Sequence, residues 1–135
     1  MRTAHPVRAL PTTPAGEPLL VVKNLAVAYG GIKALKGISL EVRRGEVVAM
    51  IGANGAGKTT TLKTIVRLLP IASGSVSYDG KDLAPVPAEE VVGRGISLVP
   101  EGRAIFPNLT VKENLELGAW NHKSHASMDE TIEDV

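Results

Sequence analysis

The chain has 135 residues, and its 15 lysines and arginines are almost balanced by 14 aspartates and glutamates, which leaves a net charge of +1. This balance argues against a nucleic-acid partner and against an anionic membrane surface, because both select strongly basic proteins. The absence of cysteine excludes disulfides and thiolate metal sites, and no apolar run approaches the roughly 18 residues of a membrane-spanning helix, so we expect no direct membrane insertion.

Residues 1–18 are predicted to form a flexible N-terminal tail, and residues 19–135 to form one folded domain. The tail lacks the continuous apolar stretch of a secretory signal, and prolines interrupt it at Pro6, Pro11, Pro14 and Pro18. The folded part opens with two expected strands. One covers residues 19–29 and ends at a pair of glycines, and the other covers residues 38–42, where apolar and polar residues alternate as in a half-buried strand.

The central feature of the sequence is a glycine-rich loop between an apolar strand and a helix. The apolar run at residues 47–51 predicts a fully buried strand. A helix is expected after the loop, with apolar residues at helical spacing until Pro70 stops it. The loop fits the phosphate-binding pattern G-x-x-x-x-G-K-[ST] at every position, through Gly52, Ala53, Asn54, Gly55, Ala56, Gly57, Lys58 and Thr59.

Each residue type in this loop suits a bound polyphosphate. Glycines let the backbone N–H groups come close to the phosphates, and the first turn of the following helix adds N–H groups and the positive end of its dipole. Lys58 supplies a charge that can follow the β- and γ-phosphates, and the Thr59 hydroxyl can ligate Mg²⁺. The sequence therefore predicts that the chain binds a nucleoside triphosphate.

The signals after the loop are shorter. Residues 75–78 predict a strand, and Asp79-Gly80 is interpreted as a hairpin turn rather than as a metal site. Residues 87–92 favour a short helix, and residues 96–99 a buried strand that Pro100 stops.

A capping box predicts the last clear helix. Residues 110–113 have the pattern S/T-x-x-E, so we expect a helix from residue 111 to about residue 120, where Trp120 is taken as a packing residue. His122 and His125 are three apart with no third ligand nearby, which favours a solvated loop over a metal site. A further helix is expected to open at residue 128 and has no stop signal, so we expect the domain to be truncated at Val135.

The hydrolytic half of a nucleotide site is not found in the sequence. Hydrolysis needs a carboxylate at the end of a buried strand to hold Mg²⁺, and a group that orients the attacking water. Glu101 is the nearest candidate, but Pro100 separates it from the apolar run, and Asp82 follows only a short strand. We therefore predict no catalytic residue within the chain and negligible hydrolysis of the nucleoside triphosphate.

Three stretches carry a family resemblance. They are residues 29–35, the loop core at residues 54–60, and residues 98–115, which run from Leu-Val-Pro-Glu-Gly-Arg to Glu-Asn-Leu. Together they resemble the nucleotide-binding domain of ABC transporters, most closely the ATP-binding subunits of branched-chain amino-acid importers, in which Glu stands where most ABC proteins have Gln. The resemblance covers only the front portion of that domain, before its signature segment, its Asp-Glu strand and its switch histidine.

The resemblance implies an α/β P-loop NTPase fold of the ABC type, truncated, with a leading antiparallel β portion. It implies that Tyr29 stacks on adenine and that residues 52–60, Thr60 included, hold the phosphates of ATP. Thr59 and Glu101 would contact Mg²⁺, with Glu101 at the position that senses the γ-phosphate. The implied partners are membrane-spanning permease subunits and a second ATP-binding subunit, in a homo- or heterodimer at the cytoplasmic face of the inner membrane.

Other interpretations stay open on the sequence alone. Tyr29 would be an ordinary strand aromatic, and Glu101 a solvated loop acid, if the resemblance does not extend to their roles. The chain as a whole would be a stand-alone ATP-binding fragment or gene remnant, or a small P-loop kinase of a metabolite. The kinase needs a lid with arginines, which Arg94 and Arg103 match poorly.

Overall fold

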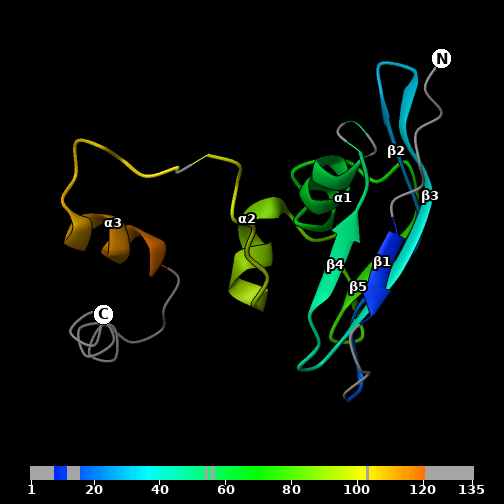
Figure 1. Ribbon diagram of the computed structural model, residues 1–135, viewed down its shortest axis with the longest axis horizontal. Coiled ribbons are helices and arrows are strands. Elements are labelled where there is room, and N and C mark those ends of the chain that lie inside the picture. The colour runs from blue at the N-terminus through cyan, green and yellow to red at the C-terminus, as the bar shows by residue number, and fades with distance from the viewer. Residues whose placement is uncertain (1–7, 12–15, 54, 56, 103, 121–135) are drawn as a thin grey trace. The chain divides into compact units, whose positions relative to one another are not determined.

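The computed structural model describes residues 8–11, 16–53, 55, 57–102 and 104–120 (Figure 1). The chain divides into two compact units, residues 1–98 and residues 99–135. Each unit is described by itself, and the prediction of one domain over residues 19–135 stays a prediction.

The larger sheet of the first unit has four antiparallel strands in the order β3-β2-β5-β6. Its main part is a long hairpin of β2 (Pro18–Tyr29) and β3 (Ile32–Arg43), joined by a glycine turn. The strand predicted over residues 19–29 is confirmed. The strand predicted over residues 38–42 is the second half of β3, which begins earlier because β2 offers backbone partners along its whole length.

A tight turn joins β5 (Ser73–Tyr78) to β6 (Lys81–Asp82) and confirms the predicted hairpin. Both turn residues have positive φ, 49° at Asp79 and 73° at Gly80, as the two-residue turns of β-hairpins require. The Asp79 carboxylate forms an ion pair with Arg44, and the Asp82 carboxylate accepts a hydrogen bond from the Ala84 N–H at 2.9 Å. Both carboxylates therefore have partners in the structure, Arg44 for Asp79 and the neighbouring Ala84 N–H for Asp82.

The second sheet contains the strand that leads into the phosphate loop. In it β4 (Val48–Ile51) pairs antiparallel with β1 (Arg8–Pro11), with Arg8 opposite Ile51. The prediction of a tail over residues 1–18 did not include β1. The prediction of a fully buried strand was wrong, because the side chains of Val47 and Ile51 are 73% and 56% exposed. Within the described residues β4 pairs with a single short strand, which leaves part of its apolar surface uncovered.

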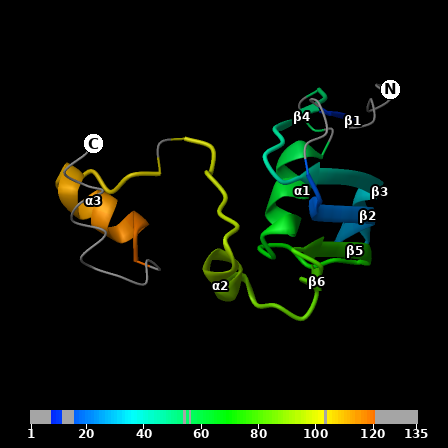
Figure 2. The same ribbon diagram turned by 90° about the horizontal axis from the view of Figure 1, so that it is seen from below.

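Helix α1 (Lys58–Ile65) lies against one face of the larger sheet, as Figure 2 shows, and contacts β2 and β3. Its inner side meets an apolar core drawn from β2, β3, β5 and the segment around α2 (Ala88–Val91). The buried apolar residues are Val22, Leu25, Val27, Leu35, Ile65, Val66, Val76, Leu83, Val86 and Val91. The core therefore holds α1, the helix that directly follows the phosphate loop, in place.

The end of α1 differs from the prediction. The helix stops at Ile65 rather than running to Pro70, because Arg67 adopts a left-handed conformation with φ 63°. The Arg67 guanidinium donates hydrogen bonds to the carbonyl oxygens of Ala84 at 2.9 Å and Val86 at 3.4 Å. These bonds tie the end of α1 to the segment before α2, which a 3-10 turn continues through Val92–Arg94.

Residues 96–99 do not form the predicted strand. Ile96 and Leu98 are half-buried against the core of the first unit, whereas Val99 is 88% exposed. No neighbouring strand among the described residues pairs with this run, so its apolar residues pack without a β-ladder.

The second unit is built around α3 (Val111–Gly118), and the predicted capping box is present. The Thr110 N–H and hydroxyl donate to the Glu113 carboxylate at 2.7 and 2.8 Å, and the Glu113 N–H donates to the Thr110 hydroxyl at 3.2 Å. Asn114 fixes the preceding loop, because its amide group both accepts from the Phe106 N–H at 2.9 Å and donates to the Phe106 carbonyl at 3.1 Å. His122 and His125 lie outside the described residues.

Candidate nucleotide-binding site

The phosphate loop runs from the end of β4 to the start of α1. Gly52 and Ala53 leave the strand, and Gly55 and Gly57 take left-handed conformations with φ of 84° and 97°. Asn54 and Ala56 lie outside the described residues. The two positive φ values account for the glycines at these positions, because other residues reach that conformation only with strain.

Gly57 is also confined by its surroundings. A Cβ atom placed on it would lie 2.3 Å from Leu35 Cδ2 and 3.7 Å from the Ala34 carbonyl oxygen. Both neighbours belong to β3, so the last turn of the loop rests on the hairpin of the larger sheet. Leu35 was not singled out in the sequence, since this contact joins residues far apart in the chain.

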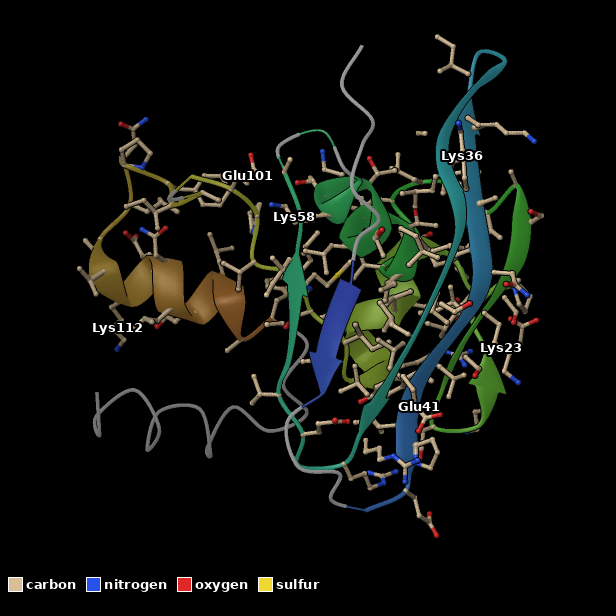
Figure 3. All side chains as sticks on the ribbon, turned by 45° about the vertical axis from the view of Figure 1, so that its right-hand side comes forward. Lys23, Lys36, Glu41, Lys58, Glu101 and Lys112 are labelled. Atoms are coloured by element: carbon tan, nitrogen blue, oxygen red, sulfur yellow. The ribbon has the colours of Figure 1, made fainter. Side chains whose placement is uncertain are left out.

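The first turn of α1 is open to an anion. Gly57 is the N-cap residue and provides no side-chain cap, and the turn carries no acidic residue that would neutralise the helix dipole. The backbone N–H groups and the positive dipole end of a helix start favour a negatively charged ligand. The Lys58 side chain lies beside the loop that follows β4 (Figure 3), where its ammonium group donates to the Gly52 carbonyl. A bound phosphate would compete with that carbonyl for the ammonium group.

The threonines after Lys58 fall into two groups. Thr59 is exposed and Thr60 half-buried on the first turn, and their contacts with phosphate and Mg²⁺ stay predictions. Thr61 and Thr64 are fully buried, and their hydroxyls donate to the carbonyls of Gly57 and Thr60 at 2.7 Å. Because the Gly57 carbonyl also accepts from the Thr61 N–H at 2.8 Å, Thr61 helps to hold the loop in place. Nothing in the sequence pattern predicted this role.

Two predicted site residues are placed but not tested. The backbone of Tyr29 ends β2, opposite Ile32 across the glycine turn, and its side chain lies outside the described residues. Glu101 is an exposed residue of the second unit. The structure therefore brings together the described residues of the phosphate loop, while stacking by Tyr29 and metal sensing by Glu101 stay predictions. No cluster of three or more potential metal-ligating residues occurs within the described part of the chain.

A hollow of about 340 Å³ lies behind the loop, between α1 and the strands. Its lining is apolar apart from one lysine, so it does not suit a triphosphate. The lining residues are Leu20, Leu40, Val42, Val48, Met50, Lys58, Leu62 and Ile65. The hollow is therefore a poorer candidate for the phosphates than the predicted loop and the start of α1.

The chain matches a known protein family over most of its length. The family model, described as ABC transporter, matches residues 35–135. The solved ATP-binding cassette MJ1267 of an ABC transporter has a TM-score of 0.69 and 30% identity, over 83% of this chain and 45% of that one. Its fold agrees with the predicted α/β P-loop NTPase of the ABC type.

Two relatives of similar sequence are the ATP-binding proteins of different transport systems. BraG, a high-affinity branched-chain amino acid transport ATP-binding protein of Pseudomonas aeruginosa, is 44% identical over 102 residues, which are 76% of this chain and 44% of BraG. LptB, a lipopolysaccharide export system ATP-binding protein of Escherichia coli, is 41% identical over 96 residues, 71% of this chain and 40% of LptB. The chain spans less than half the length of these curated relatives.

Proposed function

The chain belongs to the ABC transporter family, and on that premise we propose that it is the nucleotide-binding part of an importer that couples ATP binding and hydrolysis to uptake of branched-chain amino acids or related solutes. The single observation that carries the ATP-binding role is the phosphate loop at the uncapped start of α1. The solute class rests on the similarity to BraG and on the stretch around Glu101.

In this proposal the loop holds the β- and γ-phosphates of ATP. Backbone N–H groups of residues 52–60 donate to the phosphate oxygens, and Lys58 exchanges the Gly52 carbonyl for phosphate. The Thr59 hydroxyl is a suitable oxygen ligand for Mg²⁺, which would neutralise part of the triphosphate charge. Tyr29 would stack on the adenine, and Glu101 would respond to the metal and the γ-phosphate.

A calorimetric titration with MgATP tests the binding role. We expect Lys58→Ala to weaken binding about 10-fold or more, because a charge-assisted hydrogen bond contributes roughly 1.5–3 kcal/mol. Tyr29→Ala should weaken it less, since Lys58 also organises the loop around the phosphates. Lys63→Ala is the matched control, because Lys63 is an exposed lysine in the last turn of the same helix. Equal losses for the two lysine variants, or a larger loss for Tyr29→Ala, would contradict these roles.

The partners follow from the family. We propose that the protein acts with membrane-spanning permease subunits and a second ATP-binding subunit, at the cytoplasmic face of the inner membrane. No helix in the described part of the chain is long and apolar enough to cross a bilayer.

Uptake of labelled leucine by cells that express the wild-type protein or Lys58→Ala tests the proposed solute. Unchanged leucine uptake together with altered lipopolysaccharide export would favour the activity of LptB instead.

A further inference from the structure

We infer that Leu35 is a positioning residue that holds the phosphate loop at a fixed place on the β2–β3 hairpin, and so couples the adenine contact to the phosphate contact. The inference rests on the proposed function, because it concerns how the two ends of one ATP molecule are held. In this view Leu35 contributes to the affinity for ATP as well as to the stability of the core.

The first observation is the close approach of Leu35 to the loop. A Cβ atom on Gly57 would meet Leu35 Cδ2 at 2.3 Å, so the leucine methyl group lies against the glycine backbone itself. Gly57 is the residue from which α1 starts, and its carbonyl takes two hydrogen bonds from Thr61. A shift of Gly57 would therefore move the helix start and the Lys58 position with it.

The second observation is where Leu35 sits in the hairpin. It pairs with Val27 of β2, two residues before Tyr29, and Tyr29 pairs with Ile32 at the turn. Leu35 is 2% exposed and Val27 fully buried, so the pair is fixed in the core. One side chain thus contacts the phosphate loop and lies in the strand pair that carries Tyr29.

Close packing fixes the contact of Leu35 with Gly57 and Val27, and from there the strand pair, which has a register shift between Val27 and Ala28, continues to Tyr29. Core side chains occupy single rotamers with few voids, so they transmit a displacement rather than absorb it. Truncation at Leu35 would leave a gap under Gly57, and the loop could then settle in several positions relative to the hairpin tip. An ATP molecule held by its phosphates would no longer meet Tyr29 in the stacking geometry.

A double-mutant cycle on the full chain tests this coupling. Binding of MgATP is measured for the wild type, Tyr29→Ala, Leu35→Ala and the double variant. We expect Tyr29→Ala to weaken binding about fivefold in the wild-type background, a loss typical of one base–aromatic stack. In the Leu35→Ala background the same change should weaken binding less than about twofold, because the stack is already lost.

Two further variants separate positioning from core stability. Leu25→Ala removes the same atoms from a fully buried leucine that pairs with Ile38, farther from the turn, so Tyr29→Ala should keep its full effect there. Leu35→Met conserves volume and should restore that effect. If Leu35→Ala does not fold, Leu35→Val takes its place under the same criteria.

The outcomes are distinct. A Tyr29→Ala effect of equal size in the wild-type and Leu35→Ala backgrounds would overturn the inference and leave the proposed function intact. A wild-type chain that does not bind MgATP would overturn both.

Discussion

At the scale of single residues, Gly57 is subject to two constraints, and a comparison with Gly45 separates their effects. Its φ of 97° disfavours any side chain, and Leu35 leaves no space for one. Gly45 has a φ of 74°, and a Cβ atom placed on it would have no neighbour within 4 Å, so it carries only the first constraint. A left-handed conformation costs a non-glycine residue roughly 1–2 kcal/mol, and overpacking of a core adds about 1–3 kcal/mol.

We therefore expect Gly45→Ala to lower the free energy of unfolding by about 1–2 kcal/mol, and Gly57→Ala by about 2–5 kcal/mol. Urea denaturation of the two variants beside the wild type measures the difference. Equal losses would mean that Leu35 moves aside at little cost, and would weaken its role as a positioning residue.

At the scale of elements, the capping box makes α3 sensitive to pH. Hydrogen bonds from the Thr110 N–H and hydroxyl lower the pKa of Glu113 below its ordinary value of 4.5. The folded carboxylate thus binds its proton less tightly than the unfolded one. The stabilisation is fully present above the ordinary pKa and is lost as the pH falls through the lowered one.

The backbone N–H of Asn114 donates to the Thr110 carbonyl, so its rate of hydrogen exchange reports on the stability of the capping box. At pH 7 we expect this amide to exchange several-fold faster in Glu113→Gln than in the wild type, and the difference to disappear well below pH 4.5. Glu116→Gln serves as the control, because Glu116 lies in the same helix, outside the box. An equal effect of both variants would show that helix charge, rather than the box, governs protection.

Elements with local signals were predictable, and those that depend on distant partners were not. The turn at Asp79 and the box at Thr110 and Glu113 are set by neighbouring residues, so the sequence predicts them correctly. The exposure of β4 and the irregular run at residues 96–99 depend on which strands lie alongside. The strand β1 was missed for the same reason, since its backbone partners among the described residues belong to β4, far along the chain.

The residues of the candidate site also divide into those that the sequence predicts and those that only the folded structure reveals. The phosphate loop could be predicted from its residue spacing, and the structure has the expected strand before it and helix after it, while phosphate binding by Lys58 stays a prediction. The roles of Leu35 and Thr61 were not predictable, since the stretch at residues 29–35 indicates only an adenine contact through Tyr29, and Thr61 lies after the loop pattern. Their roles come from burial and from contacts made after folding.

At the scale of the whole molecule, the carboxylates decide whether these 135 residues can turn over ATP. Asp79 is paired with Arg44, and Asp82 accepts from the Ala84 N–H, so both serve the hairpin. Glu101 follows a run that forms no strand, so it lacks the strand-end position typical of a carboxylate that holds Mg²⁺, and its predicted contact with the metal stays untested. The described part of the chain thus has loop residues suited to binding a nucleotide, but two of these three carboxylates serve the hairpin and the third follows no strand.

We therefore expect the 135-residue chain to bind MgATP yet hydrolyse it far more slowly than about 1 s⁻¹, the lower end of ordinary enzyme turnover. Phosphate release under saturating MgATP measures this rate, with Lys58→Ala prepared in parallel as the background from contaminating ATPases. Turnover of about 1 s⁻¹ or more that Lys58→Ala abolishes would contradict the prediction. Glu101 would then be the first residue to substitute, because the family resemblance assigns it the position that senses Mg²⁺ and the γ-phosphate.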